Sequence, residues 1–331
     1  MSFVSTRRAA LLALAALPFA APATHAQSPA QSYPSKQVTM VVPFTAGGGG
    51  DILARIISQK LEGKWGRGFI VENRPGAGGI VGAVAAAKAP ADGYTLLIAP
   101  SATIAVNVTL FKSLPYDPAA DFVPLAIAAR TPFVLVANPK LPVKSIPELI
   151  AYAKSRAEPL FYATAGPGVP HHLFTELLKS MAGVNMQPVA YKGSLPALND
   201  VVAGHVPLMF VDLGPALSQI KAGNVRPLGV STATRLEELP DVPPVADTLP
   251  GFDVASWQMI LAPTGTPKPV LDKLNADLSE VLAMPDVRDH IARNGMLPVK
   301  AAPVSELQTY VKDEIGRWGD VVRKAGIAGS Q

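Results

Sequence analysis

The stretch from Val38 to Leu61 constrains the fold more than any other part of this chain. Residues 38–42 are hydrophobic and predict a short buried strand, and large aliphatic residues then recur at helical spacing as far as Leu61. Four consecutive glycines, 47–50, join these two elements. Glycine lets the backbone turn sharply and leaves its N–H groups bare, and the positive end of a helix dipole lies directly behind them. The junction therefore predicts an anion-binding loop that carries no catalytic side chain.

The alternation of strand and helix continues along the chain. Further strands are predicted at 68–72, 94–98, 133–136, 161–163, 188–191 and 208–211. Helices are predicted at 51–63, 78–88, 145–156, 170–182, 195–203, 214–222, 266–283, 286–293 and from Ser305 onward, so that the last part reads as mainly helical. This rhythm is typical of an α/β fold in which mostly parallel sheets are flanked by helices.

Two proline-rich segments, 115–124 and 239–250, predict the places where the chain crosses from one domain to another. We expect a first domain made of residues 34–125 plus 250–331, and a second made of residues 126–249. Ligands of open α/β sheets bind beyond the carboxyl ends of the strands. Two such domains would therefore face each other across a cleft that closes by hinge motion.

Residues 1–26 have the pattern of an export signal, because Arg7 and Arg8 precede an apolar run and residues 24–26 fit a cleavage site before Gln27. Sec and twin-arginine export both stay open, and a retained N-terminal anchor is the alternative. We therefore expect a periplasmic protein. The net charge of +4 includes Arg7 and Arg8 and falls to +2 without them, which is too little for nucleic-acid binding. The absence of cysteine excludes thiol catalysis and cysteine–zinc sites.

Several short motifs, each weak alone, occur in a specific order. They cover residues 43–51, 72–79, 162–173 and 191–193, followed by Trp257 and a turn at 262–267. Together with the signal segment, this ordered set resembles the substrate-binding proteins of tripartite tricarboxylate transporters, the Bug family, over essentially the whole mature chain. The resemblance implies a two-domain periplasmic-binding-protein (Venus-flytrap) fold. It also implies capture of a small organic anion, mostly a carboxylate, and its delivery to membrane permease subunits, with no cofactor and no catalytic residue; we expect a monomer.

The resemblance places the ligand carboxylate between two loops, one from each domain, which match residues 44–51 (the first loop) and 164–171 (the second loop). It implies contacts largely through backbone N–H groups, with polar residues at nearby strand ends in support. The candidate ligand-binding residues are Phe44, Thr45, Ala46, Gly47, Gly48, Asp51, Ser101, Asn107, Thr164, Ala165, Gly166, Gly168, His171, Tyr191 and Asp212. The family usually carries proline or another small residue at the positions of Thr45 and Ala46, so the threonine hydroxyl is a candidate for altering the ligand preferred.

Some of these residues have simpler interpretations. The glycines at 47–50 suit a plain strand–helix turn as well as an anion site, and those at 76–82 favour a tight turn over a dinucleotide loop. Asp51 lies in the first helical turn, where it can cap the helix instead of meeting a ligand. Adjacent histidines on a helix point about 100° apart, so His171 and His172 predict no metal site, and a packing or capping role for His171 stays open.

Two rival functions use the same cleft. An exported hydrolase or lyase needs a nucleophile with a base in reach, but no Gly-x-Ser-x-Gly occurs and no histidine–carboxylate pairing stands out. A sensor that signals to a membrane partner would share every feature above. Backbone N–H groups bind any carboxylate, so the specific ligand is left open. For Trp257 we favour packing in the core over stacking on a ligand.

Overall fold

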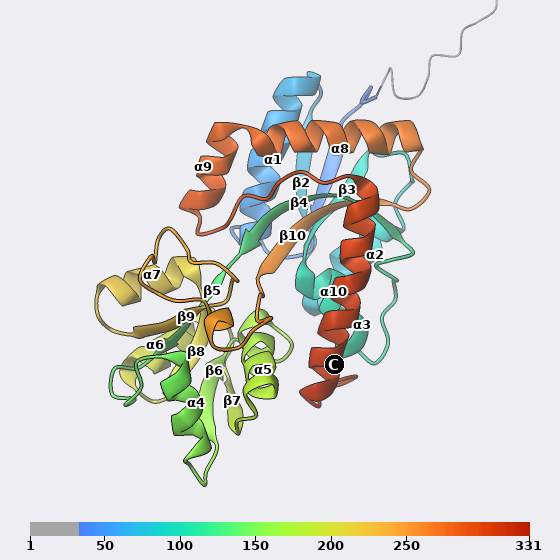
Figure 1. Cartoon of the computed structure of the whole chain (residues 1–331). Helices are drawn as coiled ribbons and strands as arrows, with labels where there is room; N and C mark the ends of the chain where they lie inside the picture. The colour runs from blue at the N-terminus through green and yellow to red at the C-terminus, as the bar shows by residue number, and fades with distance from the viewer. Residues whose placement is uncertain (1–32) are drawn as a thin grey trace, which may run out of the picture.

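The computed structural model describes residues 33–331, so the predicted signal segment, 1–26, lies outside the described residues. The chain folds into two α/β domains in which helices pack against β-sheets (Figure 1). In Figure 1 the domain that holds α1, α8 and α9 lies above the one that holds α4 to α7, and α10 runs down the side of both. The two-domain α/β fold predicted from the sequence is confirmed.

The first domain is built on a five-stranded sheet in the order β2-β1-β3-β10-β4. Its strands are β1 (Val38–Val42), β2 (Phe69–Asn73), β3 (Thr95–Pro100), β4 (Phe122–Thr131) and β10 (Ser256–Pro263). The pairs β1–β2 and β1–β3 are parallel, as predicted, whereas β10 runs antiparallel to both β3 and β4. Both β4 and β10 were missed by the sequence analysis, which interpreted their proline-containing segments as crossings and turns.

The helices of the first domain follow the predicted periodicity, except that the helical segment from 102 to 110 was not predicted. They are α1 (Gly49–Trp65), α2 (Ile80–Ala87) after a short 3₁₀ turn (Ala77–Gly79), α3 (Asn107–Leu110) after a π-helical turn (Ala102–Val106), α8 (Lys268–Ala283), α9 (Pro285–Arg293) and α10 (Val304–Lys324). In α1 the residues spaced by four, Leu53, Ile57 and Leu61, are fully buried against the sheet. The prediction that Ser305 caps α10 is wrong, since the capping position is Pro303.

The second domain contains three strands in the order β8-β5-β9 and a parallel pair, β6-β7. The elements are β5 (Phe133–Ala137), α4 (Ile146–Lys154), β6 (Leu160–Thr164), α5 (Pro170–Ala182), β7 (Met186–Ala190), α6 (Ser194–Ala203), β8 (Leu208–Asp212), α7 (Leu213–Lys221), β9 (Arg226–Val230) and a 3₁₀ turn (Val245–Asp247). β5 runs antiparallel to both β8 and β9, so this three-stranded sheet is antiparallel and not mostly parallel as predicted, and β9 was not predicted. The predicted capping box of α4 is confirmed: the Ser145 side chain accepts the N–H of Glu148 at 3.3 Å.

The two domains share one continuous hydrophobic core near α10. The ring of Phe174 in α5 stacks on that of Trp318 in α10, with 5.6 Å between the centroids. Trp257 is fully buried and donates its indole N–H to Glu314 of α10 at 2.8 Å, which agrees with packing and not ligand stacking. Because β4 pairs within the first sheet as far as Thr131, past the boundary expected at residue 125, we now propose a first crossing next to Pro132.

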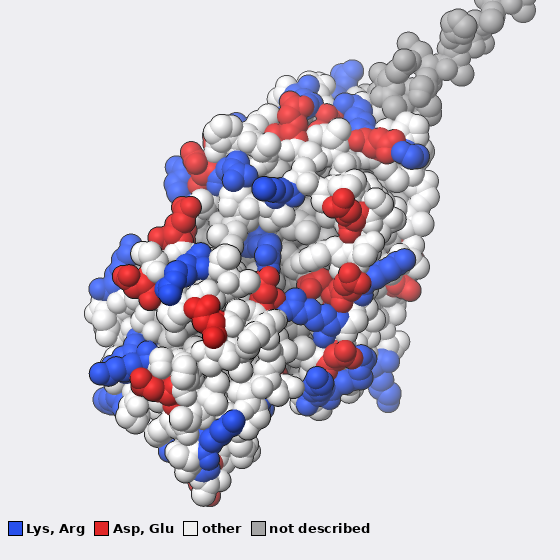
Figure 2. Space-filling view, in the orientation of Figure 1, with Lys and Arg blue, Asp and Glu red and all other residues white. Residues whose placement is uncertain are grey.

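Charge is spread evenly over the face that Figure 2 shows, where Lys and Arg side chains alternate with Asp and Glu and form no broad patch of one sign. This distribution agrees with the small net charge of the whole sequence, +4. Within residues 33–331, none of the helices combines the length and the apolar character that crossing a bilayer would require.

Candidate functional site

The first loop is held in shape by the side chain of Asp51, which is 3% exposed. Its Oδ2 accepts the backbone N–H of Gly47 at 2.9 Å and Nε of Arg55 at 2.9 Å. Its Oδ1 accepts Arg55 and Asn73 side-chain N–H groups, each at 3.0 Å. The hydrogen bonds from Arg55 hold the pKa of Asp51 below its usual range, against the opposing effect of burial. Because the protein itself supplies these donors, the contacts favour the capping role that the sequence left open for Asp51.

The backbone N–H groups that follow Gly47 lie before the first helical hydrogen bond of α1. The first helical bond runs from the N–H of Ile52 to the carbonyl of Gly48 at 3.0 Å, so the N–H groups of residues 48–51 have no intrahelical acceptor. Gly47 adopts a φ of +87°, which favours glycine. Gly48 has a φ of −79°, and a Cβ there would come within 4 Å of only the Thr45 carbonyl oxygen, at 3.8 Å. The loop therefore presents donors at the positive end of a 17-residue helix.

A cavity of about 330 Å³ lies directly against these donors. Its lining consists of the first loop and the ends of β1, β3 and β10: Val42, Pro43, Phe44, Thr45, Gly48, Gly49, Gly50, Asp51, Ile98, Pro100 and Gln258. Gln258 was missed by the sequence analysis, although a polar residue inside the apolar run of β10 was the available signal. Its Oε1 atom is buried and accepts no hydrogen bond from the described residues, and a Cβ at Gly50 would lie 3.2 Å from it. Gly50 thus leaves room for the Gln258 amide beside the loop.

Ser101 and Asn107, predicted to add polar contacts, connect segments of the first domain. The hydroxyl of Ser101 lies 3.3 Å from that of Ser256, and Asn107 donates its amide to the carbonyl of Gly78 at 3.1 Å. Both residues are buried. The backbone at residues 76–79 has a positive φ throughout, as expected of the tight turn that the sequence favoured there. Phe44 is 39% exposed beside this turn, with ring carbons 3.3 Å from where a Cβ of Gly79 would lie.

The second loop is shaped by its own side chains and contacts the first domain. Thr164 donates its hydroxyl to the carbonyl of Gly166 at 3.0 Å, and Gly168 donates its N–H to Nδ1 of His172 at 3.2 Å. Gly168 has a φ of +72°, and a Cβ there would lie 2.3 Å from Cδ2 of Leu110 in α3. The backbone of this loop therefore approaches the first domain closely, next to Leu110.

Tyr191 lies beside the second loop but turns its hydroxyl toward α6. Its backbone N–H donates to the carbonyl of Thr164 at 2.8 Å, which fixes the loop to the next strand end. Its phenol donates to Oδ2 of Asp200 at 2.7 Å. Burial and this carboxylate raise the pKa of Tyr191 to about 12. The Tyr191 hydroxyl is therefore already satisfied within the second domain.

His171, Ser194 and Asp212 form a hydrogen-bonded cluster, which we call the Asp212 cluster. His171 Nε2 lies 3.0 Å from the Ser194 hydroxyl and 3.2 Å from Asp212 Oδ2, and Ser194 donates to the same carboxylate oxygen at 3.1 Å. The statement that no histidine–carboxylate pairing stands out was therefore wrong, because residues distant in sequence make the pair. In a nucleophilic triad the serine and the carboxylate contact opposite ring nitrogens. Here both contact Nε2, so the cluster does not activate Ser194.

A chain of contacts places the Asp212 cluster on the same side of the molecule as the first loop. A Cβ at Gly49 would lie 3.9 Å from the sulfur of Met296. The preceding residue, Gly295, packs against Gly214 at the start of α7, where a Cβ at residue 295 would lie 3.0 Å from the Gly214 nitrogen. Gly214 follows Asp212 by two positions. The amino end of α1 and the start of α7 therefore contact the same short segment, residues 295–296.

A family model described as "Tripartite tricarboxylate transporter family receptor" matches residues 53–327. The chain belongs to this receptor family. BugT of Bordetella pertussis is 38% identical over 299 residues, which is 90% of this chain and 91% of BugT. The solved structure of R. palustris Rpa4515 with adipate is 40% identical, with a TM-score of 0.76 over 89% of this chain and 99% of that one. MatC from Rhodopseudomonas palustris with bound malate is 35% identical, with a TM-score of 0.72 over 88% and 100%.

Membership in this receptor family settles the choice between a binding protein and an enzyme. The matching proteins are solute receptors, and this chain is a solute-binding protein of the Bug type, as the resemblance implied. The geometry of the Asp212 cluster agrees with this conclusion, since its serine lacks the arrangement that nucleophilic catalysis needs.

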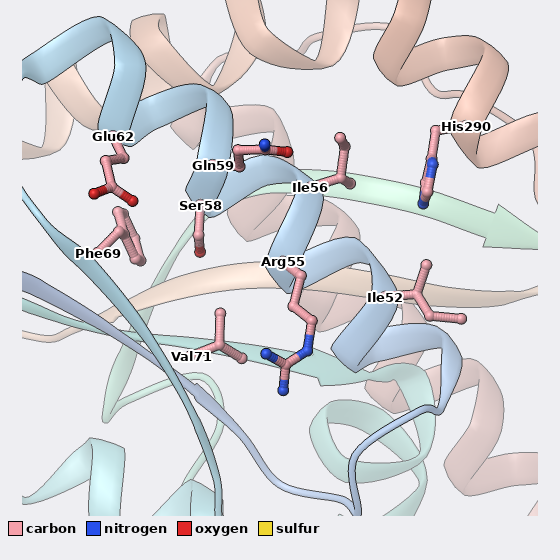
Figure 3. Close-up of a pocket in the computed structure, with 9 residues that line it drawn as sticks. All are labelled: Ile52, Arg55, Ile56, Ser58, Gln59, Glu62, Phe69, Val71 and His290. Carbon is pink, nitrogen blue, oxygen red and sulfur yellow. The ribbon is translucent and has the colours of Figure 1, made fainter.

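A second and larger hollow of the receptor, about 540 Å³, lies on the outer face of α1. Figure 3 shows its lining residues, in which Arg55 and Ile52 come from α1 and His290 comes from α9. Arg55 lines this hollow and also pairs with Asp51 behind the first loop. The outer hollow therefore adjoins the support of the ligand loop but is lined by none of the residues predicted to bind ligand.

Proposed function

We propose that this receptor captures a small organic anion, through a carboxylate group, between its two domains in the periplasm and delivers it as a monomer to the permease of a tripartite tricarboxylate transporter. The observation that carries the proposal is the set of backbone donors at residues 48–51, which face a cavity at the positive end of α1. The relatives whose structures hold adipate and malate support a carboxylate ligand.

Energetics favour binding by both domains over binding by the first loop alone. Three charge-assisted hydrogen bonds from residues 48–50 contribute about 5–9 kcal/mol in total, and the helix dipole adds about 0.3–1 kcal/mol. Association costs at least about 4 kcal/mol, whereas micromolar affinity requires about 8 kcal/mol. The first loop by itself falls short of that figure. Contacts made on closure, from the second loop and from the exposed ring of Phe44, would supply the rest.

The test is a thermal-shift screen of the mature protein with mono- and dicarboxylates, carried out with two glycine variants. Gly48→Val adds a side chain in open space at a φ that any residue adopts, so the fold should persist while the branched side chain covers the donors. Gly63→Val is the matched control, because it lies in the same helix with no atom within 4 Å of its Cβ position.

We expect a binding carboxylate at 100 times its dissociation constant to stabilise the wild type and the Gly63→Val control by about 2.7 kcal/mol. Gly48→Val should keep the wild-type melting behaviour without ligand and lose this stabilisation. Undiminished binding by Gly48→Val would remove the first loop from the site, and the absence of any carboxylate effect on the wild type would refute the proposed function.

A further inference from the structure

The second domain holds a carboxylate, that of Asp212, at the amino ends of three of its helices. Asp212 ends β8 and precedes α7, Ser194 is the first residue of α6, and His171 lies in the first turn of α5. Three helix amino ends, each carrying a partial positive charge, therefore converge on the one carboxylate of Asp212. The Asp212 carboxylate thus lies among three partly positive helix ends and is held there by the side chains of two of these helices.

The contacts of Asp212 keep it ionised and leave one of its oxygens for a ligand. Burial alone would raise the pKa of Asp212, but the hydrogen bonds from His171 and Ser194 outweigh it, and the pKa lies below its usual range. Both side-chain donors address Oδ2, and no side-chain donor among residues 33–331 addresses Oδ1. The side chain of Asp212 is 31% exposed. The carboxylate is therefore fixed in orientation, its Oδ1 atom has no side-chain donor among residues 33–331, and part of the side chain is exposed.

The negative charge of Asp212 lacks a strong cationic partner. Among the ion pairs of residues 33–331, Asp212 has no lysine or arginine, and its one partner is His171. The Nδ1 atom of His171 is buried without a hydrogen-bond partner in that same part of the chain, and the residue is 7% exposed. Nε2 is therefore the ring nitrogen through which His171 contacts both Asp212 and Ser194.

We propose that Asp212, oriented by His171 and Ser194, binds a hydrogen-bond donor at the end of the ligand remote from its carboxylate. The receptor would then take amino- or amido-monocarboxylates in preference to dicarboxylates of the same length. This inference rests on the proposed function, since it requires the carboxylate to lie at the first loop. The physical reason is that a second ligand carboxylate would approach an ionised oxygen of like charge, whereas an ammonium or amide group would meet an acceptor.

The experiment measures dissociation constants by calorimetry for probes of one length that differ only in the remote group. These are adipate, adipic acid monoamide and 6-aminohexanoate, with a second set based on succinate. The variant is Asp212→Asn. The matched control is Asp247→Asn, which removes a carboxylate from the same domain beyond β9, separated from β8 by β5 and β9.

In the wild type and in Asp247→Asn, the ammonium probe of the better-fitting length should bind at least 10-fold more tightly than its dicarboxylate, with the amide between them. Asp212→Asn should weaken the ammonium probe at least 10-fold and leave the dicarboxylate equal or tighter. Tighter binding of dicarboxylates by the wild type, or an unchanged ratio in Asp212→Asn, would overturn this inference and leave the proposed function standing. Failure of every probe in the wild type would overturn both.

Discussion

The close approach of Gly168 to Leu110 makes the contact between the domains open to a direct measurement. Gly168 of the second loop has a φ of +72°, and a Cβ there would lie 2.3 Å from Cδ2, 3.1 Å from Cδ1 and 3.3 Å from Cγ of Leu110. Leu110 is 5% exposed, so its side chain has little room to move aside. Gly168→Ala therefore combines a backbone penalty with a steric one across the domain boundary.

The two penalties are separated by a matched glycine at the other end of α5. Gly183 also adopts a left-handed conformation, with a φ of +62°, but a Cβ there meets no atom within 4 Å. A left-handed conformation costs an L-residue about 1–2 kcal/mol, which is the expected effect of Gly183→Ala. Overpacking adds about 1–3 kcal/mol, so Gly168→Ala should destabilise by about 2–5 kcal/mol.

Urea unfolding followed by circular dichroism gives these values, and a double-mutant cycle with Leu110→Ala tests their origin. Leu110→Ala removes the atoms that the methyl group introduced by Gly168→Ala would meet, so the double variant should be more stable than the sum of the single effects predicts, by about 1–3 kcal/mol. Equal effects of Gly168→Ala and Gly183→Ala, together with additivity in the cycle, would refute the close approach of the second loop to α3.

Two other perturbations act on buried carboxylates. The folded-state pKa of Asp51 is lowered, so its contribution to stability is complete above the ordinary aspartate pKa of about 3.9 and is lost as the pH falls through the folded value; Asp51→Asn should be less stable at neutral pH and should lose less stability below about pH 4 in acid titrations followed by circular dichroism. Glu314 accepts both indole N–H groups, of Trp257 and Trp318, so Glu314→Gln should cost about 1.5–3 kcal/mol and change tryptophan fluorescence. Exposed Glu306 in the same helix is the control, and equal effects at the two positions would contradict the network.

The parts of the fold that the sequence predicted are those set by local periodicity and capping. The spacing of Leu53, Ile57 and Leu61 determines the buried face of α1, and Ser145 with Glu148 determines where α4 begins. These signals involve residues that are neighbours along the chain, so they can be recognised in the sequence without knowledge of the tertiary structure. The glycine turn between β1 and α1 was predictable for the same reason.

The strands that were missed contain prolines at positions where a sheet tolerates them. Pro124 lies on the edge strand β4 where its register with β10 shifts, and Pro227 lies on the edge strand β9 where its register with β5 shifts. Proline has no backbone N–H to donate to a neighbouring strand, but at an irregular position of an edge strand no such hydrogen bond is required. From the sequence alone Pro124 indicated a crossing, and Pro227 gave no strand signal, because bulge positions depend on the partner strand.

The site residues that were missed, Gln258 and Ser194, depend on contacts between distant segments. Gln258 reaches the first loop from a strand that was itself not predicted. Ser194 joins His171 and Asp212 only because three helices begin at the same edge of the second domain. Neither relation has a signature in sequence spacing, whereas the glycine loops do.

Asp51 at the start of α1 and Asp212 at the start of α7 lie at similar helix ends, but we propose that the two ends bind different parts of the ligand, a carboxylate at α1 and a hydrogen-bond donor at α7. At α1 the carboxylate of Asp51 accepts hydrogen bonds from Gly47, Arg55 and Asn73. The backbone N–H groups that follow Gly47 are therefore left for an anion on the proposed binding mode. At α7 the Oδ1 atom of Asp212 receives no side-chain donor from residues 33–331. On the proposed binding mode, a ligand stabilises closure only if it carries an acceptor at one end and a donor at the other, so selectivity arises from the closed state and not from the first contact.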